Sequence, residues 1–161
     1  MKPVTRSGWI AYGLALAIII ADQASKYWIL NVVHLHDGMS MDVLGPLRFS
    51  YVENAGVSFG FLRGQVLARW GLSAFALIVA GVLAVWAARS ERRITGVTLG
   101  LFIGGAIGNV IDRVRFGWVT DFIDVQALHF PWVFNVADSA ISIGAVVLLA
   151  ETALISRKPA V

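Results

Sequence analysis

The sequence predicts an all-α membrane protein with four transmembrane helices, both termini in the cytoplasm, and a small β-containing segment outside the membrane between the first two helices. Of the 161 residues, 58% are hydrophobic and only 14% are charged, and the mean hydropathy is +0.75. Soluble domains are less apolar and carry about a quarter charged residues. Three nearly uncharged stretches approach or exceed the ~17–20 residues that cross a bilayer. We expect one integral membrane domain over residues 1–161.

The first expected span covers residues 9–29. Its charge-free part, residues 8–21, is too short to cross, so the helix must continue and carry Asp22 and Lys26 in its far third. A cleaved signal peptide is the alternative, because Lys2 and Arg6 precede the apolar stretch. The following "DQASK" is not a convincing cleavage site, which favours a retained helix.

The remaining spans are expected at residues 70–88, 95–111 and 133–155. The last of these contains Asp138 and Glu151. All six tryptophans fall at or near an expected boundary: Trp9, Trp28, Trp70, Trp86, Trp118 and Trp132. Tryptophan is enriched where helices leave the bilayer, so this placement supports four spans.

The orientation follows from the lysines and arginines. The side that holds both termini and the connection 89–94 carries seven: Lys2, Arg6, Arg89, Arg92, Arg93, Arg157 and Lys158. The opposite side carries five: Arg48, Arg63, Arg69, Arg113 and Arg115. Six acidic residues on that side offset their charge. The positive-inside rule places both termini in the cytoplasm and residues 30–69 and 112–132 outside. This asymmetry accounts for the net charge of +3, so that charge does not indicate nucleic-acid binding.

One outer segment has β character. Residues 43–62, "VLGPLRFSYVENAGVSFGFL", place β-branched and aromatic residues on either side of a turn-like "ENAG". A hairpin or small curved sheet is expected there, and no other region has this pattern.

Residue content excludes several chemistries. Cysteine is absent, which rules out thiol catalysis and disulfides. The three histidines have no spacing typical of a zinc site, and no serine lies in a nucleophile motif. We therefore expect no metal site.

Several polar residues and glycines have a structural explanation when each is taken alone. Asp22 and Lys26 are four apart on one helix face and can form an ion pair. Gly104 and Gly108 form a G-x-x-x-G pattern, which is typical of close helix packing. Interhelical hydrogen bonding, a helix end or a turn would account for the rest: Asn109, Asp112, Arg113, Asn54 and Gly56.

Asp121 and Asp138 are harder to explain structurally. Antiparallel helices would bring both to the same outer face although they are 17 positions apart. Two carboxylates that share a site tend to hold one proton between them. That state suits an aspartyl protease, in which one carboxylate activates water and the other donates a proton to the scissile carbonyl.

Five motifs occur in order: "DQASK", "NAGVSFG", "GGAIGNVIDR", "VTDF" and "FNVAD". Together they strongly resemble the lipoprotein signal peptidase family, also called signal peptidase II. The resemblance implies a bacterial inner-membrane aspartyl endopeptidase without a metal or cofactor. Such enzymes remove the signal peptide from diacylglyceryl-modified prolipoproteins by cleaving just before the lipidated cysteine. The site would face the outer, periplasmic side, and we expect a monomer surrounded by membrane lipids.

The resemblance also implies roles for individual residues. Asp121 and Asp138 would be the catalytic pair, and the others would bind substrate or support the pair: Asn54, Gly56, Asn109, Arg113, Asn135, Asp22 and Lys26.

Two other classes remain open from the residues themselves. A small proton- or ion-coupled transporter would also carry membrane acids, although near the midplane rather than toward one face. A non-enzymatic membrane subunit could use the glycines and outer loop for contacts, but would not need two acids beside Asn and Arg.

Overall fold

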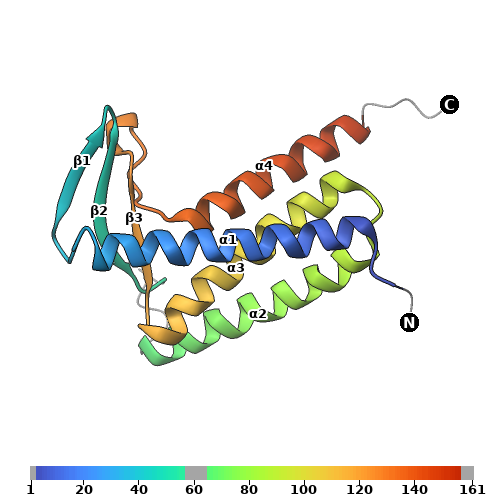
Figure 1. Ribbon diagram of the computed structural model, residues 1–161, viewed down its shortest axis with the longest axis horizontal. Coiled ribbons are helices and arrows are strands. Elements are labelled where there is room, and N and C mark those ends of the chain that lie inside the picture. The colour runs from blue at the N-terminus through green and yellow to red at the C-terminus, as the bar shows by residue number, and fades with distance from the viewer. Residues whose placement is uncertain (1–2, 57–64, 157–161) are drawn as a thin grey trace.

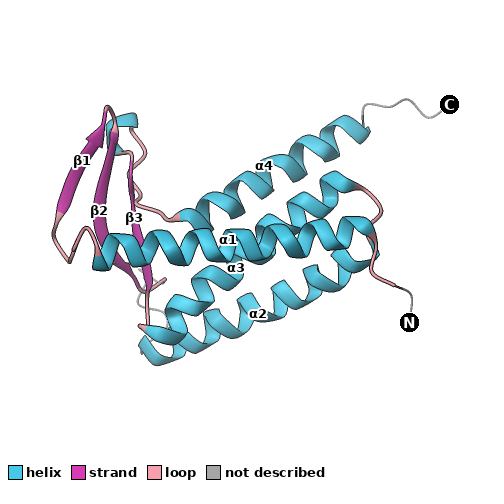
Figure 2. Ribbon diagram, viewed as in Figure 1, coloured by secondary structure: helices cyan, strands magenta, loops and turns pink. Residues whose placement is uncertain are grey.

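Four long helices run side by side, and a small sheet covers one end of them (Figures 1 and 2). The computed structural model describes residues 3–56 and 65–156. Within them lie α1 (Arg6–Asn31), α2 (Gln65–Arg89), α3 (Arg93–Arg115) and α4 (Val136–Ser156). All four are long and apolar enough to cross a membrane. The prediction of four apolar helices is confirmed.

Helix boundaries differ from the expected spans. α2 begins at Gln65, five residues before the expected 70, whereas α4 begins at Val136, three residues after the expected 133. α3 continues past residue 111 to Arg115. Asp112 does not end this helix in water, because its side chain is buried and its carboxylate accepts a hydrogen bond from the Thr120 amide at 3.0 Å. A charged residue can stay inside a helix when partners within the protein replace water.

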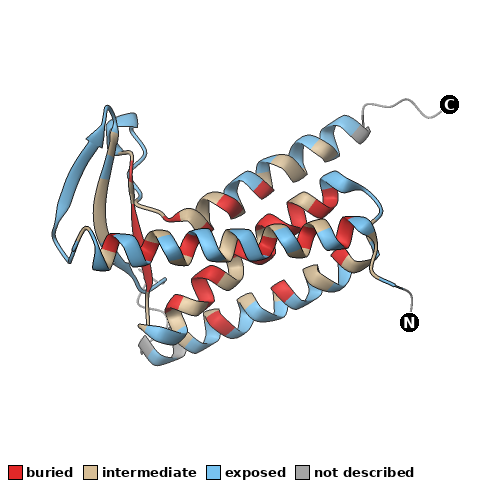
Figure 3. Cartoon of the chain, viewed as in Figure 1, coloured by how far each residue is buried: buried red, intermediate tan, exposed pale blue. Residues whose placement is uncertain are grey.

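Small residues bring the helices close together, and α3 is the central helix (Figure 3). A Cβ atom on Gly96 would lie 2.5 Å from the Ser7 carbonyl oxygen of α1. One on Gly105 would lie 2.5 Å from the Ala137 carbonyl oxygen of α4. Only glycine permits such close backbone approach, which is the usual basis of helix association in lipid.

The sheet contains β1 (Ser40–Leu44), β2 (Leu47–Asn54) and β3 (Val119–Asp124), antiparallel and in that order. Two sequence expectations were wrong here. The hairpin turns at Gly45 and Pro46, where Gly45 adopts φ +56° as primed two-residue turns require, and not at "ENAG". The third strand, "VTDFID", comes from the second outer segment, far along the chain. Residues 57–62 of the expected β segment lie outside the described residues.

Aromatic and aliphatic side chains attach the sheet to α1. Ile29, Leu35 and Phe122 form a buried cluster, and Phe49 packs edge-on against both Trp28 and Phe122. We call this the sheet end of the bundle (residues 22–31, 108–124 and 135–138). The opposite end, where α1 begins and α4 finishes, is the terminal end (residues 5–12, 84–96 and 151–154) (Figure 1).

Candidate active site

Polar side chains from four elements meet at the sheet end, where the chain passes from β3 into α4. Phe134 pairs with Ile123 of β3 through hydrogen bonds of 2.7 and 3.0 Å. This bridge brings Asn135, the residue before α4, beside the middle of β3. Asp121 and Asp138 thereby come into one site although they belong to different elements.

Asp121 is almost fully buried and accepts two amide hydrogen bonds. Asn54, at the end of β2, donates to Oδ2 at 2.8 Å, and Asn135 donates to Oδ1 at 2.7 Å. Since β2 and β3 are paired neighbours, the strand ladder positions Asn54 next to this carboxyl group. Both oxygens of Asp121 are therefore held in place by neutral donors.

Asp138 lies in the first turn of α4 and forms a reciprocal cap with Asn135. The Asp138 amide donates to Asn135 Oδ1 at 2.9 Å, and the Asn135 amide donates to Asp138 Oδ2 at 3.3 Å. This is the geometry of a capping box, and the helix N-terminus favours negative charge there. Asn109 of α3 donates to the other oxygen, Oδ1, at 2.8 Å. Asn135 thus links the two carboxyl groups directly.

Burial raises the pKa of Asp121 from 3.8 to about 7, and the negative charge of Asp138 adds to this rise. The hydrogen bonds from Asn54 and Asn135 oppose it. At neutral pH Asp121 is therefore protonated for a large fraction of the time. A pair of interacting acids in this state can both accept and donate a proton.

Asn54 and Gly56 form a turn that also belongs to the site. The Gly56 amide donates to Asn54 Oδ1 at 2.9 Å, which leaves the Asn54 amide group free to reach Asp121. Gly56 has φ +83°, and a Cβ there would lie 2.7 Å from Leu72 Cδ1 and 3.5 Å from Arg113 Nη2. Glycine is required because this backbone conformation is rare for other residues.

Arg113 extends from the end of α3 into the same region. Its charge interacts with Asp138, Asp121 and Asp112. Its Nε is buried without a hydrogen-bond partner among the described residues, and Nη1 makes only a 3.5 Å contact to the Asn109 carbonyl. Buried donors are normally paired, so the guanidinium has hydrogen-bonding capacity for a ligand.

Asp22 and Lys26 form the expected ion pair, with Nζ 2.7 Å from Asp22 Oδ2. They do not touch Asp121 or Asp138 through any described hydrogen bond. Asp22 Oδ1 instead accepts from the Ala137 amide of α4 at 2.9 Å, and Lys26 also pairs with Asp112 at 2.8 Å. The Asp22–Lys26 ion pair therefore supports the site through Asp112 and the backbone of α4, without a described hydrogen bond to Asp121 or Asp138.

Sequence reasoning missed three contributors. Asp112 was treated as a helix end, yet it is buried between Lys26, Gln23 and the Thr120 amide. Gln23 links Asp112 at 2.9 Å to Asp22 at 3.2 Å. Both Asp112 and Gln23 lie inside quoted motifs, "GGAIGNVIDR" and "DQASK", and that adjacency was the available signal. Thr120 also lies inside a quoted motif, "VTDF", but it acts through its backbone, so its side chain gave no signal of its role.

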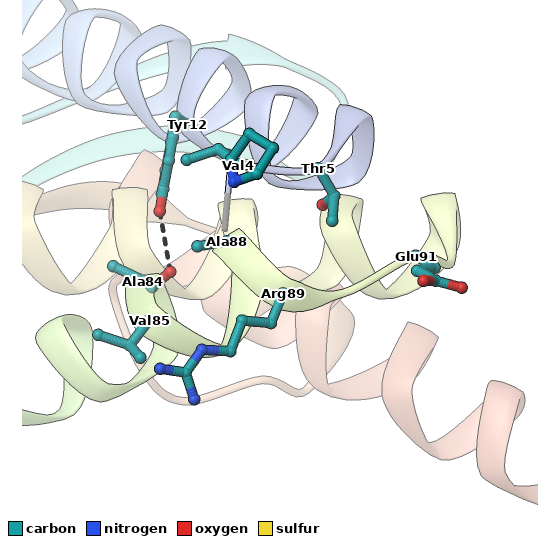
Figure 4. Close-up of a pocket in the computed structure, with 9 residues that line it drawn as sticks. Val4, Thr5, Tyr12, Ala84, Val85, Ala88, Arg89 and Glu91 are labelled. Carbon is teal, nitrogen blue, oxygen red and sulfur yellow. Dashed lines mark hydrogen bonds between the residues drawn. The ribbon is translucent and has the colours of Figure 1, made fainter. Parts of the chain in front are cut away.

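A cavity of about 490 Å³ opens beside Asp121, Asn54 and Gly56, with Glu53 and Trp132 also on its wall. A larger one, of about 740 Å³, lies at the terminal end between α1 and α2 (Figure 4). The Tyr12 hydroxyl beside it is occupied by a 2.9 Å hydrogen bond to the Ala84 carbonyl. The smaller cavity reaches Asp121, whereas the larger one is lined by Arg89 and Glu91 and by neither Asp121 nor Asp138. In the described part of the chain, no cluster of three His, Cys, Asp or Glu side chains could hold a metal ion.

Comparison with known proteins shows the family of this chain. The family model described as Signal peptidase (SPase) II matches residues 14–154. The chain belongs to the signal peptidase II family. Lipoprotein signal peptidases of Caulobacter vibrioides and Rhizorhabdus wittichii are 49% and 43% identical to it over 152 and 156 residues, covering 94% of this chain and 90% of each relative. That of Shewanella loihica is 37% identical over 160 residues, 95% of this chain and 91% of its own length.

Two solved structures of bacterial membrane enzymes have the same fold. One aligns with a TM-score of 0.81 at 26% identity over 100% of this chain and 99% of its own. The other aligns with a TM-score of 0.78 at 28% identity, covering 94% and 97%. Membership of the signal peptidase II family, together with four helices able to span a membrane, makes this chain a membrane protease of bacterial type.

Proposed function

We propose that this chain is an aspartic endopeptidase that removes the signal peptide from diacylglyceryl-modified prolipoproteins, cleaving just before the lipidated cysteine. The observation that carries the proposal is the Asn135 link. One side chain holds Asp121 at 2.7 Å and caps the helix turn that carries Asp138. The family supplies the substrate class, since the relatives are lipoprotein signal peptidases.

Asp121 and Asp138 are the catalytic pair. Because burial raises the pKa of Asp121 to about 7, Asp121 carries the shared proton and donates it to the scissile carbonyl oxygen. Asp138, held at the N-terminus of α4, accepts a proton from the attacking water. The C–N bond then breaks as the amine takes a proton from the pair and a hydroxyl group of the tetrahedral intermediate returns one to it, so the pair ends singly protonated.

The neighbouring residues bind and orient. Asn54 and Asn135 direct the carboxyl group of Asp121, and Asn109 directs that of Asp138. Arg113 has unpaired donor capacity for a substrate carbonyl, and Gly56 keeps the approach to it open.

The substrate arrives by lateral diffusion, because its signal peptide is an apolar helix and its cysteine carries lipid. The sheet end faces the outer, periplasmic side, and both termini face the cytoplasm. The chain acts as a single membrane domain and as a monomer among lipids, in the bacterial inner membrane. A transporter is not supported, since the buried charges of the described residues gather at one end of the helices and not near their middle.

The test is cleavage of a diacylglyceryl-modified precursor by Asp121→Asn and Asp138→Asn. Each variant should lose activity by at least roughly 10²–10⁴-fold, because an amide cannot accept the proton of water or share one with its partner. Folding should survive, because a neutral amide of similar size is cheaper to bury than a carboxylate.

A chelator should leave the wild-type rate unchanged. Near-normal turnover by either variant, or reversible loss of activity with chelator, would rule out the aspartic mechanism.

A further inference from the structure

Lys26 is buried behind the catalytic pair, with its side chain only 4% exposed. Its ammonium group is fully engaged: Asp22 Oδ2 lies at 2.7 Å, Asp112 Oδ2 at 2.8 Å and Asn109 Oδ1 at 3.4 Å. An ammonium group has three hydrogens, so none is left for a substrate or for the catalytic acids. Lys26 therefore acts on the reaction through these partners and through its charge, and not by contact with substrate.

The two carboxylates that Lys26 joins hold equivalent positions. Asp112 accepts from the Thr120 amide at 3.0 Å, and Thr120 immediately precedes Asp121. Asp22 accepts from the Ala137 amide at 2.9 Å, and Ala137 immediately precedes Asp138. Each carboxylate thus anchors the backbone one residue before a catalytic aspartate.

Close packing leaves this arrangement little freedom. A Cβ on Gly108 of α3 would lie 2.8 Å from Asp22 Oδ2 and 3.3 Å from the Ala137 side chain, so α1, α3 and α4 meet here at minimum separation. Gln23 joins the same two carboxylates from the side, at 2.9 and 3.2 Å.

We infer that Lys26 is a positioning residue which, through Asp22 and Asp112, holds β3 and α4 at the separation that the two catalytic aspartates need. The inference rests on the proposed function of Asp121 and Asp138. Lys26 sets the separation of β3 and α4 because it binds both carboxylates at once. Each carboxylate accepts a hydrogen bond from a different backbone segment. Removing Lys26 leaves two buried acids that repel each other, and the segments behind the pair separate.

The first test is Lys26→Met in detergent-solubilised full-length enzyme with a diacylglyceryl-modified precursor. We expect kcat to fall by roughly 10²-fold, the effect of displacing catalytic groups by about 1 Å. KM should change by less than about threefold, because Lys26 does not reach the substrate. The matched control is Glu151→Gln, which removes a carboxylate paired with a cation at the terminal end, where Arg92 lies 3.5 Å away.

The pH profile provides a readout that a purely structural role would not move. Loss of the Lys26 charge favours protonation of Asp121, the proposed proton donor, so the alkaline limb of kcat should move to higher pH in Lys26→Met and stay in place in Glu151→Gln. The other charged groups around Asp121 are unchanged in both variants: Asp138 of α4, Asp22 of α1, Asp112 and Arg113 of α3, Glu53 of β2 and Asp124 of β3.

Asp112→Asn keeps an acceptor oxygen for the Thr120 amide but weakens the contact with Lys26. It should lower kcat by about tenfold, and it gives the decisive comparison if Lys26→Met does not fold. A folded Lys26→Met, or in its absence a folded Asp112→Asn, with the kcat and pH profile of Glu151→Gln would overturn the inference. That outcome is distinct from failure of the proposed function, which would appear as activity in Asp121→Asn or Asp138→Asn.

Discussion

The sheet end and the terminal end belong to the same helices, yet they are held together differently. Every buried charged residue that the structure describes lies at the sheet end: Asp22, Lys26, Asp112, Asp121 and Asp124. The terminal end relies on contacts such as Thr5 Oγ1 to the Ser90 carbonyl, at 2.6 Å, and on one peripheral ion pair between Glu151 and Arg92. Close glycine contacts occur at both ends.

The difference separates packing from chemistry. Glycine contacts and a buried apolar cluster, which includes Ala11 of α1 and Leu99 of α3, join these helices toward the terminal end, so helix packing there does not require buried charges. Burying charges carries a desolvation penalty, and replacing a buried ion pair with apolar residues is often neutral or stabilising. This fits the proposal that Asp22, Lys26 and Asp112 serve the pair Asp121 and Asp138 and its spacing.

The sheet end and the terminal end should lie on opposite sides of the membrane. A reporter that is active only outside the cytoplasm should work when fused near Gly45 or Gly117 and be silent when fused at Arg92. We expect activity at the first two sites and none at the third, because the positive-inside rule places Gly45 and Gly117 outside and Arg92 in the cytoplasm. Activity at Arg92 would reverse the orientation and place the site in the cytoplasm.

Stability should depend on pH through Asp121. Its pKa is 3.8 ordinarily and about 7 in the folded protein, so folding binds its proton more tightly. This contribution to stability is complete below pH ~4 and is lost as pH rises through ~7, by roughly 4 kcal/mol at most.

Asp121→Asn lacks this titration. The Tm of Asp121→Asn minus the Tm of the wild type should therefore increase from pH 4 to pH 8. Thermal unfolding in detergent measures this difference. A difference that stays constant over this range would mean that Asp121 is not held protonated by burial.

Two glycines test whether packing and chemistry are separable. Gly96→Ala at the terminal end and Gly105→Ala near the sheet end each place a Cβ 2.5 Å from a main-chain oxygen. Both should destabilise the fold by about 1–3 kcal/mol. Only Gly105→Ala should also slow cleavage by the folded enzyme, since it pushes on Ala137 beside Asp138.

Gly13→Ala is the control, because nothing lies within 4 Å of its Cβ position. Thermal unfolding and cleavage rates should both match the wild type. Equal loss of cleavage in Gly96→Ala and Gly105→Ala would mean that the two ends are mechanically coupled.

The smallest effect is expected for Glu151→Gln. The Nη1 of Arg92 lies 3.5 Å from Glu151 Oε1; the Glu151 side chain is 12% exposed, but Arg92 is 63% exposed, so solvent screens the pair from the Arg92 side. The free energy of unfolding should change by less than about 1 kcal/mol, and the cleavage rate should stay the same. A large loss of cleavage would show that the terminal end also contributes to catalysis.

Much of the fold could be predicted from the sequence because hydropathy and helix periodicity depend on neighbouring residues. The four apolar stretches predict four helices through length and hydropathy alone, and Asp22 and Lys26 share a face through helix periodicity. The third strand was missed because "VTDFID" is short and contains two acids, and becomes a strand only by pairing with β2. The hairpin turn was misplaced since "ENAG" and "GP" are both turn-like, and cross-strand pairing decides between them.

The sequence by itself determined that this is a membrane protein with four apolar helices, and its ordered motifs indicated the family and the two candidate aspartates. Only the tertiary structure decided how those aspartates are joined: through Asn135 in front, and through Asp22, Lys26 and Asp112 behind. The physical reason is that hydropathy and helix periodicity act over neighbouring residues. The pKa of Asp121 and the separation of the pair arise from burial and hydrogen bonds between residues that are far apart along the chain.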